Sequence, residues 1–345
     1  MTRRRVILLF VLAFAALAAV VLSCVAGTTD IAVADVFGAL KSALTGVPDD
    51  GDAARAIVCE IRLPRAVAAL LCGAALGSAG AALQGLFRNP LADPGLIGVS
   101  SGGSLGALLV FAFAGEALAR VPAAAHAFAL PLAAMAGALA VTLLVLALSG
   151  TLGRMRVGGM LLVGIAVNSA ISAVAGLILH FSADSQIRTY LFWMLGGLDR
   201  AEWRLVAPVA LFTLAGLLAL PRFARDLDVL ALGEAEAHFA GVNVKRLQRA
   251  VVWISAGMVG AAVAIGGMIG FVGLVAPHLV RLVFGPAHRF LVPASGLTGG
   301  LLLIAADVAA RALGGAAELP LGVVTALIGA PFFLGILLRG ERSAA

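Results

Sequence analysis

The side chains in this sequence best suited to chemistry are arginines whose positions suggest recognition of acidic groups. Arg62 and Arg65 open a long uncharged segment, and Arg311 lies near the end of another. Guanidinium groups bind carboxylates through paired hydrogen bonds, so arginines gathered on one face would grip acidic side chains of a partner protein. Asp307 and Arg311 are spaced i, i+4, which offers the simpler account that they pair with each other.

A second group of candidates lies in residues 182–203, which hold the only tyrosine and two of the three tryptophans. Arg188, Tyr190 and Trp193 belong to this stretch. Aromatic side chains near a membrane surface commonly anchor a helix at the level of the lipid headgroups. The alternative is a short outer helix that lines the entrance of a pathway, with Arg188 facing an acidic ligand. Both interpretations stay open on the residues alone.

Residue sets for bond-making chemistry are absent from the sequence. It contains no GxxxxGK[ST] motif, so if ATP drives this protein, a separate subunit must bind the nucleotide. Cys24, Cys59 and Cys72 lack metal or redox spacing, and neither His126 nor His180 has a second ligand at i+3 or i+4. We therefore expect no resident cofactor or metal, and no intramembrane enzyme.

Membrane-spanning helices must position these candidates. The chain is 62% hydrophobic and 12% charged, with mean hydropathy +1.08, whereas soluble domains carry about 25% charged residues. The sequence predicts an all-α polytopic membrane protein forming a single transmembrane domain over residues 1–345. Ten spans are expected near residues 6–26, 64–86, 95–115, 127–149, 158–181, 203–221, 250–272, 274–286, 290–312 and 319–338. The eighth, about 13 residues, must be buried among neighbours or cross only partly.

Basic residues in the connections predict the orientation of the chain. Most of the 24 lysines and arginines fall in inner loops if both termini lie in the cytoplasm. The apolar run after Arg5 is longer than the core of a signal peptide, so it is interpreted as the first span. The net charge of +6 is attributed to topology, and nucleic-acid binding is not expected.

The longest inner loop, residues 222–249, is too polar to enter lipid. A short helix in it would place Leu230, Ala231, Ala235, His238 and Phe239 on one face and end near Gly241. This pattern favours a docking surface for a cytosolic partner over a loop that merely sets topology.

An internal repeat divides the chain into two halves, about 62–181 and 246–338. The segment RLPRAV (62–67) recurs as RLQRAV (246–251), and at the same offset Phe87 matches Phe271. Five spans separate the copies, so they must point in opposite directions. Inverted repeats are a common plan of transporters, with the pathway at the repeat interface.

Several segments, taken together and in order, resemble the FecCD/BtuC family of type II ABC importer permeases, which includes permeases for haem, ferric siderophores and vitamin B12. The matching segments are RLPR (62–65), the glycine-rich span ending in Gln84, RNPLADPGLIGVSSGG (88–103), FWMLGGL (192–198), GxIGFVGLVAPHLVR (267–281) and ELPLGVVTALIGAPFFL (318–334). They extend over nearly the whole chain.

This resemblance implies a BtuC-like homodimer in the bacterial inner membrane, bound to two cytosolic ABC ATPase subunits that hydrolyse the ATP. A periplasmic binding protein would dock on the outside. The resemblance implies roles for three sets of residues: docking of that protein by Arg62, Arg65 and Arg311; a translocation pathway at Arg188, Tyr190 and Trp193, on a short helix near 187–196; and ATPase coupling by Leu230, Gly233, Glu234, Ala237, His238 and Gly241.

The resemblance favours haem, or another iron chelate, as the cargo. The stretch FSADSQIRTYLFWMLGGL (181–198) is most similar to haem permeases, and Arg188 would suit haem propionates as well as many siderophores. Ferric siderophores and vitamin B12 remain alternatives. A secondary transporter driven by an ion gradient is the rival of a different class, but it predicts intramembrane carboxylates, of which Asp307 is the best candidate.

Overall fold

A computed structural model describes residues 3–27, 31–45, 52–118, 122–151, 157–314 and 318–342. Within these residues, seven helices are long and apolar enough to cross a membrane: Arg3–Val25, Ala54–Phe87, Ala125–Gly150, Gly159–His180, Trp203–Leu230, Val244–Gly266 and His288–Gly314. Shorter apolar helices lie at Val99–Gly115, Val272–Phe284 and Leu321–Gly335. All ten predicted spans are therefore helical, which confirms the predicted fold class.

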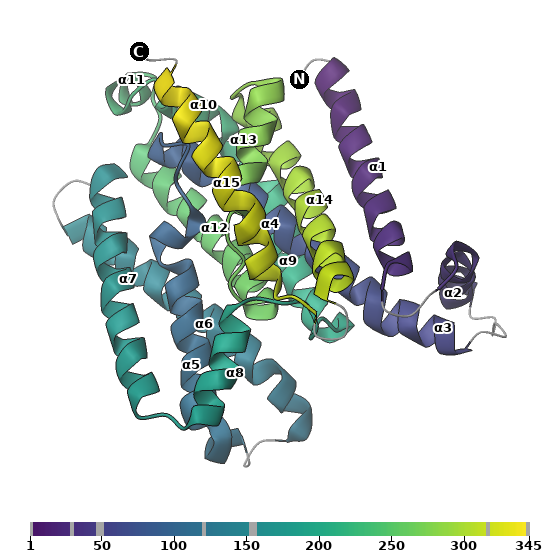
Figure 1. Ribbon diagram of the computed structural model, residues 1–345. Helices are drawn as coiled ribbons and strands as arrows, with labels where there is room; N and C mark the ends of the chain where they lie inside the picture. The colour runs from purple at the N-terminus through teal and green to yellow at the C-terminus, as the bar shows by residue number, and fades with distance from the viewer. Residues whose placement is uncertain are drawn as a thin grey trace.

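The helices follow one another with short connections (Figure 1). Their bounds are α1 Arg3–Val25, α2 Val33–Thr45, α3 Asp52–Ala56, η1 Ile57–Arg62, α4 Leu63–Phe87, η2 Pro94–Ile97, α5 Val99–Leu118, α6 Ala123–Thr151, α7 Val157–His180, α8 Asp184–Met194, α9 Trp203–Ala219, η3 Leu220–Phe223, α10 Ala224–Leu230, α11 Glu234–Phe239, α12 Val244–Gly266, α13 Val272–Phe284, α14 His288–Gly314 and α15 Leu321–Arg342. Hydropathy did not predict α2 and α3, which are too short to span a bilayer.

The molecule has two ends. We call the end that carries α10 and α11 the platform end, and the end that carries α2, α3 and α8 the rim end (Figure 1). Helix α1 begins and α15 finishes at the platform end (Figure 1). An even number of crossings requires this arrangement.

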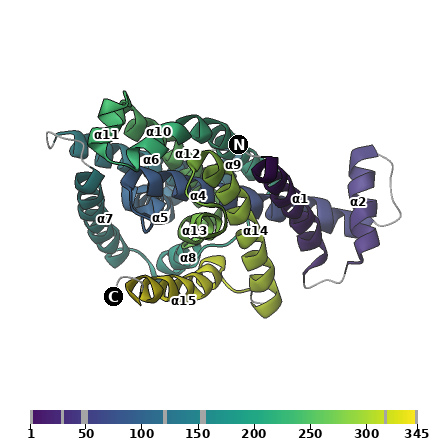
Figure 2. The same ribbon diagram turned by 90° about the horizontal axis from the view of Figure 1, so that it is seen from above.

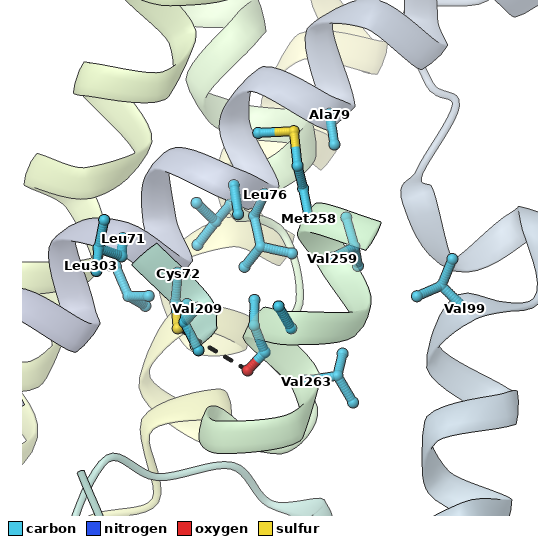
Figure 3. Packing of buried hydrophobic residues seen from close by; sticks show 14 of the residues in the cluster. Leu71, Cys72, Leu76, Ala79, Val99, Val209, Met258, Val259, Val263 and Leu303 are labelled. Atoms are coloured by element: carbon cyan, nitrogen blue, oxygen red, sulfur yellow. Dashed lines mark hydrogen bonds between the residues drawn. The ribbon is translucent and has the colours of Figure 1, made fainter. Parts of the chain in front are cut away.

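Helix α4 forms the centre of the bundle. It packs against α14, α12, α13 and α9, and in the view along the bundle it lies among them (Figure 2). Apart from Arg65, its sequence is uncharged and rich in Ala and Gly, and Pro64 suits its first helical turn. Large side chains from its neighbours, such as Met258 and Leu303, fill the space around Leu71 and Leu76 (Figure 3).

Small residues let α4 and α14 approach closely. A Cβ added to Gly73 would overlap the backbone carbonyl of Gly299, and one added to Gly77 would overlap that of Ser295. In a membrane, where lipid is as apolar as leucine, such close backbone packing contributes strongly to helix association. Gly73 and Gly77 therefore serve the packing of α4 against α14.

Helix α12 ends six residues earlier than the predicted span, at Gly266. Gly267 has φ of 66° and Phe271 has φ of 65°, both in the left-handed region, so the helix cannot continue through this segment. Helix α13 follows with 13 residues, as predicted for the eighth span. At about 1.5 Å per residue it is too short to cross a hydrocarbon core of about 30 Å.

Candidate functional site

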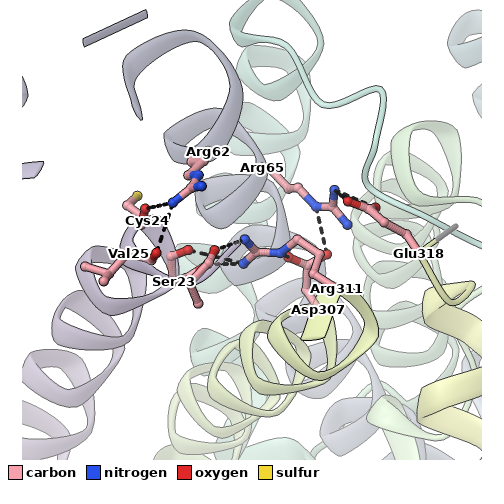
Figure 4. Close-up of polar contacts among 9 residues, drawn as sticks. Ser23, Cys24, Val25, Arg62, Arg65, Asp307, Arg311 and Glu318 are labelled. Atoms are coloured by element: carbon pink, nitrogen blue, oxygen red, sulfur yellow. Dashed lines mark hydrogen bonds and ion pairs between the residues drawn. The ribbon is translucent and has the colours of Figure 1, made fainter. Parts of the chain in front are cut away.

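A chain of charged groups joins four residues at the rim end (Figure 4). Asp307, 1% exposed, accepts hydrogen bonds from Arg65 Nε at 2.9 Å and from Arg311 Nε at 3.1 Å. Arg65 Nη1 also donates to Glu318 Oε2 at 2.9 Å, and the Glu318 side chain is 37% exposed. The predicted i, i+4 pairing of Asp307 with Arg311 is confirmed. The chain of contacts runs from the buried interior to the surface.

Two of the arginines also hold the end of α1 (Figure 4). Arg62 Nη1 donates to the carbonyl oxygens of Cys24 at 2.8 Å and Val25 at 3.0 Å, and Arg311 Nη2 donates to Ser23 Oγ at 3.0 Å. The last carbonyls of a helix lack intrahelical donors, and the helix dipole favours cations there. Arg62 and Arg311 therefore fasten α1 to the bundle.

These contacts bear on the predicted docking arginines. Arg62 and Arg311 are buried, whereas Arg65 reaches a rim cavity of about 540 Å³ that Glu318 and Trp193 also line. Arg65 is thus the one of the three that lines this cavity, and its guanidinium is already paired with the carboxylate of Glu318. Docking by the three arginines remains a prediction.

A second cavity of about 540 Å³ lies between α5, α7 and α8. Two segments between long helices border it: Asp93 and Gly95 lie at the start of the short 3-10 helix η2 after α4, and the non-helical residues Met268 and Gly270 follow α12. Helices α4 and α12 are the two that contain the repeated motif. Non-helical backbone at membrane depth is tolerated where it is buried in protein or lines a cavity. Interrupted segments in the two halves of a transporter mark its binding region.

Neutral polar side chains hold the walls of this cavity together. Ser101 Oγ donates to Asn168 Oδ1 at 2.6 Å, and Asn168 Nδ2 donates to the Gly95 carbonyl at 3.2 Å. Ser104 and Tyr190 share a hydrogen bond of 2.5 Å. Burial raises the pKa of the Tyr190 phenol, partly offset by that bond, so this hydroxyl stays protonated. The cavity therefore offers hydroxyl and amide groups from three helices.

Asp93 is the acidic residue bordering the cavity. Its Oδ1 accepts the Gly95 N–H at 2.7 Å, which caps η2. Burial raises the pKa of this carboxyl, and the Gly95 hydrogen bond acts in the opposite direction. Its position between η2 and the cavity fits a structural cap of the non-helical segment.

The three predicted pathway residues lie in different surroundings. Tyr190 lines the cavity between α5, α7 and α8, and Trp193 is buried beside the rim cavity of Arg65. Arg188 is exposed in a groove along the outer face of α8, with Asp184 one turn before it. The chain by itself does not bring these three side chains into one cavity. Their joint pathway role remains a prediction.

At the platform end, the predicted single helix consists of two. We call residues 224–241 the platform. Gly233, with φ of 146°, separates α10 from α11, so the predicted shared face of Leu230, Ala235 and His238 is wrong. Leu230 ends α10 and is buried, whereas Ala235 and His238 are exposed on α11. Only glycine readily adopts this φ.

The end of α11 follows the prediction. Gly241 has φ of 81°, and the Val242 N–H donates to the Ala237 carbonyl at 2.9 Å, which closes the last helical turn. Ala237 is fully buried, while Leu232 and Phe239 are 76% and 88% exposed. The platform thus presents two large apolar side chains on a polar surface.

Two contacts that the sequence did not reveal connect the platform with α4 and α14. His288 Nδ1 lies 2.6 Å from Asp228 Oδ1, and the His288 ring fills the space beside Gly85 of α4. Arg88, which ends α4 with φ of 50°, lies 3.8 Å from Glu234 of α11. The partners are far apart in sequence, so no local pattern could have indicated these pairs.

Among the residues that the structure describes, no group of three His, Cys, Asp or Glu side chains is arranged to hold a metal ion. The three cysteines are free thiols.

Comparisons with known proteins agree along the chain. The FecCD transport family matches residues 14–339. The hemin transport system permease protein HmuU of Yersinia pestis is 41% identical over 291 residues, 84% of this chain and 85% of that protein. The cobalamin import system permease protein BtuC of Halobacterium salinarum is 42% identical over 299 residues, 87% of this chain and 77% of that protein.

Solved structures share the fold. A metal-chelate type ABC transporter in an inward-facing conformation has a TM-score of 0.82 at 30% identity and covers 96% of this chain and 99% of its own. PsaBC from Streptococcus pneumoniae, in complex with Fab, has a TM-score of 0.54 at 18% identity over 79% of this chain and 89% of its own, a likeness of fold alone.

Proposed function

The chain belongs to the FecCD transport family, and from this premise we propose that it is the permease subunit of an ATP-driven importer for haem or another iron chelate. The observation that carries the proposal is the cavity between α5, α7 and α8, bordered by the segments that follow α4 and α12. A mostly apolar cavity that carries a few hydroxyl and amide groups is what a cargo with both apolar surface and hydrogen-bonding groups requires.

We propose that two copies of the chain enclose the pathway. Ser172 and Leu191 line the cavity and are exposed, so one chain supplies one wall of a passage. A second copy related by two-fold symmetry would supply the other. The exposed Arg188 would then face the shared space, where its charge suits the carboxylates of haem propionates or of siderophores.

The platforms of the two copies are proposed to receive two cytosolic ATPase subunits, one on each. Leu232 and Phe239 are of the type that anchors an interface, and the positive-inside distribution favours the platform end as cytoplasmic. Movement of the platform would reach α4 through Glu234 of α11 and Arg88, and α14 through Asp228 of α10 and His288. A periplasmic binding protein is proposed to dock at the rim end.

Uptake by the reconstituted complex tests this function. Proteoliposomes that contain the chain and its ATPase should accumulate haem when ATP is present, without an ion gradient. Cobalamin and several ferric siderophores, assayed in parallel, identify the cargo. Uptake that follows an ion gradient and ignores ATP would favour a secondary transporter, and vigorous uptake by the chain alone would contradict the proposal.

Docking at the rim gives a prediction for Glu318→Gln. Because Glu318 holds Arg65, an acidic side chain of the binding protein must compete with it, and neutral glutamine should compete less. An exposed ion pair is worth about 0.2–1 kcal/mol, so the Kd of docking should fall by up to about fivefold. Surface plasmon resonance with the binding protein measures the Kd.

The matched control is Glu202→Gln, which removes an exposed acid that pairs with Arg204 at 2.6 Å. It should leave docking unchanged. Weaker or unaltered docking by the Glu318 variant would contradict the role of Arg65. Substitution of buried Arg62 would test the attachment of α1 instead, since its guanidinium binds the α1 carbonyls.

A further inference from the structure

A groove at the start of α12 has no role in the transport proposal. Its volume is about 560 Å³, and it is lined by Asn243, Lys245, Arg246, Arg249, Ala250 and Trp253. It begins two residues after the platform ends, on the part of α12 whose outer face is exposed. Beyond Ile254 the same helix is buried in the bundle.

The groove concentrates positive charge. Lys245, Arg246 and Arg249 are exposed, and no carboxylate in the described part of the chain lies within ion-pair distance of them. Arg65 and Arg311 on the rim, in contrast, are paired with Asp307, and Arg65 also with Glu318. Three unpaired cations around one hollow favour an anionic occupant.

Trp253 lies at the end of the groove that is farther along α12 from the three cations. It lies eight residues beyond Lys245 on the same helical stripe, about 12 Å further along the axis. Its side chain is 40% exposed. Tryptophan is enriched where headgroups meet acyl chains, and a basic pocket above such a residue matches the cross-section of a phospholipid. A soluble anion or an acidic protein surface has no acyl chain to pack against the exposed indole of Trp253.

We propose that this groove binds an anionic phospholipid of the leaflet on the platform side. The lipid phosphate accepts hydrogen bonds from Lys245, Arg246 and Arg249, and the glycerol and upper acyl chain lie against Trp253. Because α12 follows the platform directly, a lipid held here fixes the base of the platform to the membrane surface. This inference concerns a ligand other than the cargo and does not rest on the proposed transport function.

Lipid binding by the purified full-length chain in neutral detergent tests the site. Native mass spectrometry with added phosphatidylglycerol gives the apparent Kd, and phosphatidylcholine serves as the zwitterionic comparison. The triple variant Lys245→Gln, Arg246→Gln, Arg249→Gln should bind phosphatidylglycerol at least about tenfold more weakly, because it removes the three cations that hold the lipid phosphate. Trp253→Ala should weaken binding of the lipid while leaving its salt dependence intact.

The matched control removes three other exposed arginines near the platform end, through Arg222→Gln, Arg225→Gln and Arg289→Gln. It lowers the net charge equally and should keep the wild-type Kd. An equal loss in both triple variants would overturn the proposal, because it would reflect total charge. Displacement of the lipid by glycerol phosphate at equal concentration would overturn the lipid assignment. The lipid assignment would also be overturned if the Lys245, Arg246 and Arg249 triple variant no longer bound the ATPase subunit but still bound the lipid.

Discussion

Replacing Asp307 with alanine should lower the free energy of unfolding by about 3–5 kcal/mol, the cost of leaving buried partners of an ion pair without their counterion. Asp307 is 1% exposed and serves both Arg65 and Arg311. Without it, two guanidinium groups face each other inside the rim end. Repulsion between these groups should weaken the attachment of α1, because Arg311 Nη2 donates to Ser23 Oγ near the end of that helix.

Unfolding by denaturant in detergent, followed by circular dichroism, measures this loss. The matched control is Glu318→Gln in the same network: its partly exposed side chain should cost no more than about 1 kcal/mol. In a double-mutant cycle of Asp307→Asn and Arg65→Gln, the losses of unfolding free energy should not add. Asp307→Asn leaves Arg65 without a counterion, and Arg65→Gln removes that unpaired charge. An Asp307→Ala chain as stable as wild type would show that the network contributes little.

The second large effect is expected from Ala237→Pro in α11, which should uncouple ATP hydrolysis from uptake. The Ala237 N–H donates to the Gly233 carbonyl at 3.0 Å, and its side chain is fully buried. Proline removes that donor and adds ring atoms where no space exists, at a cost of about 3 kcal/mol or more. Because α11 carries Glu234, the contact with Arg88 at the end of α4 would be lost with the helix.

Uptake per ATP hydrolysed, measured in proteoliposomes with the partner ATPase, should fall by about tenfold or more, since a shift of 3 kcal/mol depopulates the ordered helix by over a hundredfold. Ala235→Pro is the matched control. Ala235 lies in the first turn of α11, where an N–H has no intrahelical acceptor and proline is tolerated. Normal uptake per ATP hydrolysed in the Ala237→Pro variant would contradict a role of the platform in coupling.

Hydropathy predicted much of this fold because it acts locally. A run of about twenty apolar residues in lipid forms a helix wherever it lies, whereas the contact of the α4 glycines with α14 appears only in the structure. The i, i+4 pair of Asp307 and Arg311 was likewise readable from spacing. The platform shows the limit: the apolar pattern suggested one helix, and the unusual φ of Gly233 divides it in two.

The amino-acid sequence by itself determined that this chain crosses a membrane many times and contains no GxxxxGK[ST] motif. Only the tertiary structure decided what the arginines of the chain touch. Arg65 and Glu318 are 253 residues apart, and Asp228 and His288 are 60 apart. Such pairs depend on how α4, α10, α14 and α15 are placed against one another. That placement is set by the summed packing of many small side chains, and no single stretch of sequence encodes it.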